Sequence, residues 1–348
     1  MGRGKTALQI GQECLNELRN RFLILTDEEY VDELSCYKVH DAVREMLIEI
    51  AREESFFSMH HRDKLSRRVI IYENMPQAII ENNNSSRLRT LLVVVDTETV
   101  PPILKANLHK FQRLRMLHLE LASATNAVES VSFSKWLKGI GSLHHLVYLH
   151  LERVYALTAL PDSIGNLSNL QWLAIINCCN LKSLPSCITR LEKLTVLRVV
   201  GCDSIECWPK GLGKLPNLVD LQVENSCISL SDLKQLKKLR RLFMQISHEE
   251  QVGEEECNVL EIPESLQLLR KHARLAKSCF PTQSSSSVEM LVLVELEDLE
   301  EDWANIERVM LFLKRAEVVN CPKLKYSEEA FQPRPYGGMT WKKYIKGN

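Results

Sequence analysis

The feature that most constrains this chain is one short pattern that returns at a constant spacing between positions 146 and 224. Four segments share it: leucine, two variable residues, leucine, one variable residue and an aliphatic residue. Their central leucines are Leu149, Leu173, Leu197 and Leu221, which are equally spaced, and a fifth copy around Leu242 follows at a slightly shorter interval. Because side chains two residues apart on a strand share one face, each copy predicts a short strand with an apolar face.

A second position repeats with the strands. Val154, Cys178, Cys202 and Ser226 each stand three residues after the last aliphatic residue of their copy. A period in the twenties with this arrangement indicates leucine-rich repeats. One copy cannot bury its leucines alone, so we predict that the copies stack into a solenoid of the α/β class, a horseshoe whose concave side is lined by the strands.

The segments between the strands repeat as well. Leu160-Pro161, Leu184-Pro185 and Trp208-Pro209 recur at the same spacing as the strands, and each precedes a short apolar turn. Proline inside a helix removes a backbone hydrogen bond and clashes with the preceding turn. These positions therefore argue against the alternative of a helical array with leucines on one helical face.

Composition bounds the class of protein. The 348 residues are 45% hydrophobic and 26% charged, which is ordinary for a globular chain of about two domains. The net charge of −1 provides no overall attraction to nucleic acid or to an anionic membrane. No apolar run approaches about 18 residues, and the chain begins without a long apolar core, so we expect neither a membrane span nor a signal peptide.

Cysteine usage favours a reducing compartment, and we expect a cytoplasmic protein. The eleven cysteines are an odd number, and no pair has C-x-x-C spacing. Cys178, Cys202 and Cys321 lie at the repeat position that takes a small buried residue. We expect no metal site, because zinc motifs are missing and the adjacent His60 and His61 would point to opposite faces of a strand.

Residues 1–60 have a different pattern, which predicts a partial winged-helix domain. An amphipathic helix begins after Thr6, and the segments Phe22–Leu25 and Cys36–Val39 predict two strands. A second helix is expected over about 41–52, with Asp41 as its N-cap or in its first turn, where a carboxylate interacts favourably with the helix dipole.

Two stretches of this region carry a resemblance to a known family. Residues 13–24 and 37–47 resemble the end of the nucleotide-binding region of plant nucleotide-binding leucine-rich-repeat (NB-ARC/LRR) disease-resistance proteins. Val39-His40-Asp41 matches the place of that family's Met-His-Asp motif, with valine in place of methionine. The Leu-Pro-x-x-Ile-x-x-Leu segments are similar too, so that the resemblance covers most of residues 7 to about 325.

The resemblance implies that His40 and Asp41 stand at a cofactor-binding position, since ADP or ATP is bound near this motif in the full-length family. The family's phosphate-binding loop lies further upstream, so the chain looks like the C-terminal part of such a protein, and we expect no cofactor in this chain itself. Gly2-Arg-Gly-Lys-Thr6 does not supply the loop, because G-x-x-x-x-G-K-[ST] would place its first glycine before residue 1.

These patterns divide the chain into three expected regions. They are a partial winged-helix domain over 1–60, a leucine-rich-repeat domain over 61–326 and a disordered tail over 327–348. The repeats are expected to be irregular over 61–140 and 247–287.

Two segments within the repeats depart from the period. The central leucines Leu117 and Leu149 stand further apart than any neighbouring pair after them, which predicts an insertion near 125–134. Residues 260–276 fit either a degenerate repeat or a helix, and the pattern leaves both open.

The residues beside the inward apolar positions would line the concave face. Tyr148 and Trp172 would be neighbours there, and aromatic residues and arginine dominate protein interfaces. The alternative is that Trp172 is covered by a neighbour within the chain. The residues predicted to bind a partner are Tyr148, His150, Trp172, Arg198, Asp220, Gln222, Arg241 and Phe243.

No catalytic motif appears, so we predict a binding protein and not an enzyme. The favoured hypothesis is an intracellular plant immune receptor or a fragment of one. Its protein partner would be a pathogen effector, a guarded host protein or its own nucleotide-binding domain, and we expect neither nucleic acid nor a membrane as partner. Two alternatives stay open: an ADP/ATP-binding switch in its own right, and a generic leucine-rich-repeat scaffold.

Overall fold

The structure is a computed structural model in which the chain forms two compact units, Met1–Arg68 and Val69–Asn348. The residues that the structure describes are 7–21, 23–26, 37–39, 67–72, 85–95, 108–121, 130–206, 208–224, 230–246, 268–273, 290–294, 315–319 and 340–344, with the single positions 43, 46, 47, 49, 50, 304, 321, 324 and 325.

The first unit contains the predicted helix and the predicted pair of strands. Helix α1 spans Ala7–Asn20, and strands β1 (Ile24–Thr26) and β2 (Tyr37–Val39) pair antiparallel, with Ile24 opposite Val39. The second helix falls largely outside the described residues, although its described positions, such as Val43 and Ile50, are helical. The winged-helix assignment itself stays a prediction.

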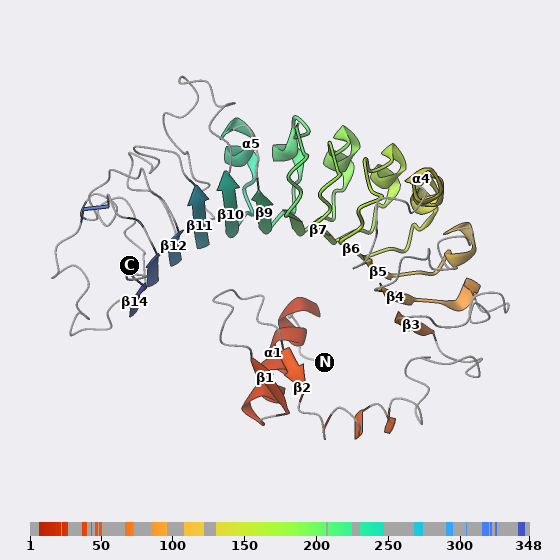
Figure 1. Cartoon of the computed structure of the whole chain (residues 1–348), viewed down its shortest axis with the longest axis horizontal. Coiled ribbons are helices and arrows are strands. Elements are labelled where there is room, and N and C mark those ends of the chain that lie inside the picture. The colour runs from red at the N-terminus through yellow and green to blue at the C-terminus, as the bar shows by residue number, and fades with distance from the viewer. Residues whose placement is uncertain are drawn as a thin grey trace. The chain divides into compact units, whose positions relative to one another are not determined.

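The second unit confirms the predicted solenoid. Its strands belong to one twelve-stranded sheet in which the strands β5 to β9 pair in parallel, in the order of the chain. Figure 1 shows the strands side by side along a curve, with the short helices on the outer side. The strands are β3 (Arg68–Tyr72), β4 (Thr90–Val95), β5 (Met116–Leu121), β6 (Tyr148–Glu152), β7 (Trp172–Ile176), β8 (Val196–Val200), β9 (Asp220–Glu224), β10 (Arg241–Ile246), β11 (Leu268–Ala273), β12 (Met290–Val294), β13 (Arg315–Val319) and β14 (Thr340–Tyr344).

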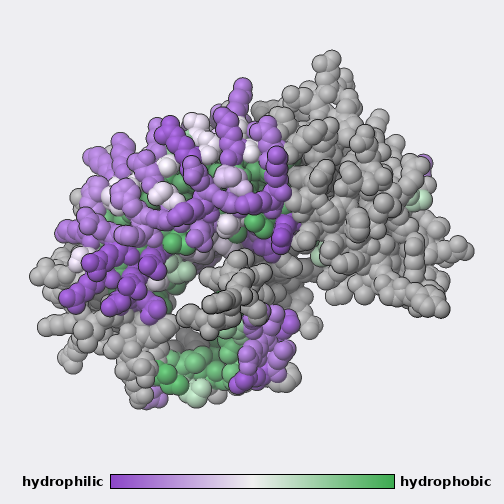
Figure 2. Space-filling model, turned by 180° about the vertical axis from the view of Figure 1, so that it is seen from behind, coloured by the Kyte–Doolittle hydropathy of each residue, from purple (hydrophilic) through white to green (hydrophobic). Residues whose placement is uncertain are grey.

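The repeated leucines form a continuous buried file. Leu149 is in register with Leu173, Leu173 with Leu197 and Leu197 with Leu221, and none of the four has any exposed surface. Each leucine is thus packed between the equivalent leucines of the repeats before and after it, which removes its apolar surface from water. On the side seen in Figure 2, the described surface of the second unit is mostly hydrophilic, as expected when its apolar side chains point inward.

On the convex side, two short helices begin directly after the repeated prolines. The 3-10 helices η5 (Asp162–Asn166) and η6 (Ser186–Arg190) begin directly after Pro161 and Pro185, whose φ angles of −72° and −71° are the values that the proline ring fixes. The other described helices of this unit are η1 (Ser85–Arg87), η3 (Leu108–Phe111), α4 (Ser130–Lys138), η4 (Gly139–Ser142), η7 (Leu212–Lys214) and α5 (Leu230–Gln235).

Hydrogen bonds between repeats recur with the same period. The amide Nδ2 of Asn169 donates to the carbonyl of His144 at 2.7 Å, and that of Asn217 donates to the carbonyl of Glu192 at 2.7 Å. The Cys178 and Cys202 thiols are buried and lie within 3.7 and 3.8 Å of carbonyl oxygens of the preceding repeat. Each of these side chains therefore links its own repeat to the backbone of the repeat before it.

The structure also describes parts of three segments in which the repeat pattern is irregular or absent. Residues 268–273 form β11, so the repeat interpretation holds there and the helix does not. The long interval between Leu117 and Leu149 contains helix α4, whose Phe133, Trp136 and Leu137 are buried in the core. The prediction of a disordered tail is wrong for Thr340–Tyr344, because this segment adds β14 to the edge of β13 by backbone pairing.

A left-handed residue follows each of three consecutive strands, and glycine is required at one of them. Arg153, Asn177 and Gly201 have φ angles of 52°, 53° and 65°. A Cβ on Gly201 would collide with the side chain of Asn177, whereas a Cβ on Gly211, whose φ is 86°, would meet only ordinary contacts with Lys214 at 3.5 Å or more.

We predict that Gly201→Ala lowers the free energy of unfolding by more than Gly211→Ala does. Both substitutions carry the left-handed strain of about 1–2 kcal/mol, and only the first adds a collision. Urea unfolding of the two variants measures the difference, and adding Asn177→Ala to Gly201→Ala should recover part of it. Equal losses in the two single variants would contradict this packing explanation.

Candidate protein-binding face

Three rows of side chains run across strands β5 to β10 on the side of the sheet opposite the leucine file. We call these rows the concave face. Register fixes them, because residues paired across parallel strands point to the same side. The rows are Met116, Tyr148, Trp172, Val196, Asp220 and Arg241; then His118, His150, Ala174, Arg198, Gln222 and Phe243; then Glu120, Glu152, Ile176 and Val200.

The structure places all eight predicted partner-binding residues on the concave face, but two of them are not exposed. Six are half-buried: Tyr148, His150, Trp172, Gln222, Arg241 and Phe243. Arg198 and Asp220 retain only 5% and 1% of their surface, so the expectation that they face solvent was wrong. Arg198 and Asp220 are buried because they form an ion pair with each other, and the strand pattern alone does not predict this pair.

Asp220 is the centre of a buried ion pair. Its Oδ2 accepts hydrogen bonds from the guanidinium of Arg198 at 2.9 Å and from that of Arg241 at 2.8 Å. Arg198 and Asp220 are both buried, whereas Arg241 is 32% exposed, so the two fully buried charges balance each other.

The ion pair continues into two aromatic rings. The guanidinium carbon of Arg198 lies 4.8 Å from the ring centroid of Trp172, within the range of a cation–π contact. Trp172 in turn stacks on Tyr148, with centroids 5.6 Å apart and planes inclined by 25°. We call the chain Tyr148, Trp172, Arg198, Asp220 and Arg241 the aromatic–ion row. It crosses five adjacent strands, so its side chains are held rigidly before any partner arrives.

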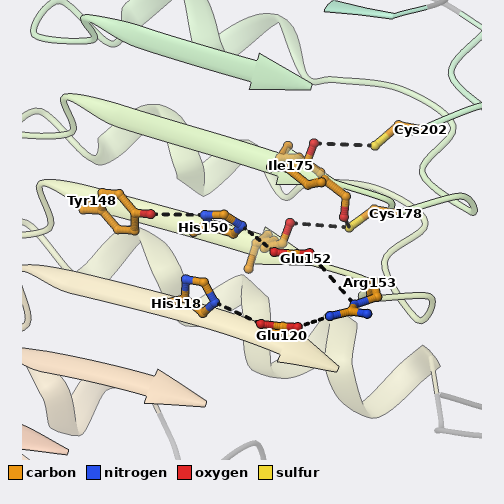
Figure 3. A network of polar contacts seen from close by, with 11 residues as sticks. His118, Glu120, Tyr148, His150, Glu152, Arg153, Ile175, Cys178 and Cys202 are labelled. Atoms are coloured by element: carbon orange, nitrogen blue, oxygen red, sulfur yellow. Dashed lines mark hydrogen bonds and ion pairs between the residues drawn. The ribbon is translucent and has the colours of Figure 1, made fainter. Parts of the chain in front are cut away.

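A second group of contacts, the histidine–glutamate network, lies beside it on β5 and β6 (Figure 3). The hydroxyl of Tyr148 lies 3.1 Å from Nδ1 of His150, and Nε2 of His150 lies 3.1 Å from Oε2 of Glu152. One neutral tautomer satisfies both contacts, with Nδ1 accepting from the tyrosine and Nε2–H donating to the carboxylate. His118 lies alongside, its ring centroid 4.3 Å from that of His150.

Arg153 closes this network at the end of β6. Its left-handed backbone turns the chain directly after the strand, and its guanidinium pairs with Glu120 of the preceding repeat. The Nε of Arg153 is also 3.9 Å from Oε1 of Glu152. The network therefore joins two repeats that are separated in the chain by the insertion.

Burial and these contacts shift the pKa values of several ionisable groups, among them Glu152, His118 and Tyr148. The hydrogen bond from His150 is the main cause that lowers the pKa of the Glu152 carboxyl, so it is ionised at neutral pH. Burial is the main cause that lowers the pKa of His118, and the nearby His150 ring lowers it further, because two imidazolium charges so close together would repel each other. Burial raises the pKa of the Tyr148 phenol, so it keeps its proton.

Sequence reasoning missed His118, Glu120 and Arg153. A signal for the first two was available, because the segment 114–119 has the strand pattern and His118 stands at the same repeat position as His150. Arg153 gave no comparable signal, since its role depends on a left-handed backbone. His40 and Asp41, predicted to stand at a cofactor-binding position, lie outside the described residues, as does the Gly2–Thr6 segment.

Parallel strands in register, buried leucines and short outer helices define a leucine-rich-repeat protein. The family described as "Leucine-rich repeat region" matches residues 87–325, well over half of the chain, and the chain belongs to that family. None of the described helices is both long and apolar enough to cross a membrane.

The relatives found for the chain are plant disease-resistance proteins. Disease resistance RPP13-like protein 4 of Arabidopsis thaliana is 28% identical over 162 residues, which are 46% of this chain and 18% of that protein. Disease resistance protein RPP8 of the same plant is 28% identical over 160 residues, 42% of this chain and 17% of that protein. The chain thus spans less than a fifth of the length of these curated relatives.

Two solved structures of similar fold are the leucine-rich repeat domain of the type III effector XopL and the functional domain of InlJ from Listeria monocytogenes. The first is 16% identical, with 98% of both chains covered and a TM-score of 0.43. The second is 14% identical, with 69% of this chain and 56% of that chain covered and a TM-score of 0.35.

We predict that Asp220→Asn lowers the free energy of unfolding by about 3 kcal/mol, because it leaves the buried Arg198 without a counter-charge. Chemical denaturation measures the loss. Glu192→Gln is the matched control, since it makes the same change at an exposed carboxylate and should change the unfolding free energy by less than about 0.5 kcal/mol. A similar small effect of both substitutions would mean that the ion pair does not stabilise the repeats.

Proposed function

We propose that this chain is the repeat-bearing part of a plant defence protein and that its concave face binds a protein. The relatives' names support the defence role, and the repeat fold supports the binding role, because the inner surfaces of solenoids are extended and suited to binding. The observation that carries the proposal is the aromatic–ion row, which places tyrosine, tryptophan and arginine side by side on adjacent strands.

The chemistry of this row indicates what kind of partner fits. Tyrosine, tryptophan and arginine are the residues most enriched among those that carry binding energy at protein interfaces. Trp172 and Tyr148 are half-buried and fixed by stacking, so they present apolar area without a large loss of side-chain freedom on binding. A pathogen effector, a guarded host protein and the nucleotide-binding domain of the same receptor are the candidate partners.

Photo-crosslinking tests the surface. A benzophenone amino acid is introduced at Phe243 on the concave face, and, as the control, at the exposed Arg190 of η6 on the convex side. Both proteins are exposed to extracts of healthy and of infected leaves. We expect a discrete crosslinked protein from position 243, none from position 190, and loss of the product when Trp172→Ala is added.

The captured protein is then purified and titrated against the unlabelled chain. Trp172→Ala should weaken its binding by about tenfold or more, as for a central interface aromatic, while Arg190→Ala should leave it unchanged. The same product from both labelled positions, or an affinity that Trp172→Ala does not change, would contradict binding by the concave face.

The competing hypothesis of a nucleotide switch in this chain depends on His40 and Asp41. A titration with fluorescent ADP separates it from the protein-binding proposal. The proposal expects no saturable binding to this chain, and micromolar binding that His40→Ala abolishes would favour the switch.

A further inference from the structure

The concave face holds three metal-ligating side chains in one place. One donor atom each from His118, His150 and Glu152 lies within 4.8 Å of the others. The residues come from two adjacent strands of the sheet, and His118 is paired directly with His150. In Figure 3 both imidazole rings and the Glu152 carboxylate are seen on the same side of these strands. We propose that His118, His150 and Glu152 form a binding site for a divalent transition-metal ion, with Zn²⁺ as the ion best suited to the donors.

The donor set matches zinc chemistry. Two imidazoles and one carboxylate are a common protein ligand set for Zn²⁺ in sites that keep a further position open for water or another ligand. Nε2 of His150 and Oε2 of Glu152 are already 3.1 Å apart, but separations of up to 4.8 Å are too wide for zinc–ligand bonds of about 2.0–2.2 Å, so small side-chain rotations must close the wider gaps around the ion. All three side chains are half-buried and not fully enclosed, so side-chain rotation is available to them without a change in the backbone.

The charges around the site leave it net negative. The charged groups around the site are Glu120, Glu152 and Arg153, so the formal charge of the cluster is −1 when both histidines are neutral. The arginine opposes the ion, but its closest partner is Glu120 and not Glu152.

A further shell of groups is already in place. When Nε2 of His150 binds a metal, its Nδ1 carries the proton and donates to the Tyr148 hydroxyl, which lies 3.1 Å away. A hydrogen bond of this kind fixes the ring orientation of metal-binding histidines. Beside the other histidine, a carboxylate oxygen of Glu120 lies 3.7 Å from Nε2 of His118.

The buried cysteines Cys178 and Cys187 do not compete for the ion. The hydrogen bond with Cys202 and burial hold the pKa of the Cys178 thiol far above its usual range, and burial raises that of Cys187. Thiols that keep their protons are poor zinc ligands, because the thiolate is the binding form.

Zinc binding to the full chain, measured by competition with a chromophoric zinc chelator at pH 7.5, tests the proposal. The probe is Zn²⁺ alone. We expect the wild-type chain to bind one zinc ion. Each of the variants His118→Ala, His150→Ala and Glu152→Gln should bind zinc at least about tenfold more weakly. His145→Ala, at an exposed histidine of the turn before β6, is the matched control and should bind as the wild type does.

Cobalt spectroscopy gives a second measurement that needs no variant to fold. Co²⁺ added to the wild-type chain should give the visible bands of a four- or five-coordinate ion without a thiolate charge-transfer band. A thiolate band, no visible bands, or zinc affinity equal in the wild type and all three ligand variants would overturn the site. Because both measurements use the chain without a partner, their failure leaves the protein-binding proposal untouched, and failure of the crosslinking experiment leaves the metal site untouched.

Discussion

Burial of one file of leucines between successive repeats is the interaction on which the second unit depends. Leu149, Leu173, Leu197 and Leu221 each pack against their counterparts in the neighbouring repeats and are fully buried. Truncating such a leucine to alanine lowers the free energy of unfolding by about 2–5 kcal/mol. The loss combines the transfer free energy of the removed atoms with the cost of the cavity that the neighbouring side chains cannot fill. Since every repeat contacts only its neighbours, the stability of the unit is approximately the sum of the stabilities of the repeats and of the interfaces between adjacent repeats.

The same period that buries the leucines also aligns the opposite side of the sheet. A one-residue shift of any strand would expose its leucines, so the register is fixed and the solvent-side residues are fixed with it. Tyr148, Trp172 and Arg198 consequently stand in a row, although each is in a different repeat. Both proposals follow from this alignment: adjacent aromatic and charged side chains suit a protein partner, and two histidines on paired strands suit a metal ion.

The sequence was sufficient to predict what periodicity controls. The strands, their inward leucines, the buried Cys178 and Cys202 and the proline positions of the outer turns all follow from the constant repeat spacing. Apart from the Tyr148–Trp172 neighbours, contacts between side chains of different repeats were not predicted. The burial of Arg198 and Asp220 depends on their approach to 2.9 Å, and β14 depends on the open edge of β13. The pairing of His118 with His150 was missed because the insertion interrupts the constant spacing, although the strand pattern of 114–119 places both histidines at the same repeat position.

The reactivity of adjacent cysteines tests the stacking register most directly. Cys178 is fully buried at the repeated inward position, and its neighbour Cys179 is exposed. Brief alkylation of the native chain, followed by peptide mass spectrometry, reports each thiol separately. Stacked repeats in this register predict rapid modification of Cys179 and modification of Cys178 and Cys202 only after unfolding. Equal rates at Cys178 and Cys179 in the folded protein would contradict the buried file and, with it, the alignment of the concave face.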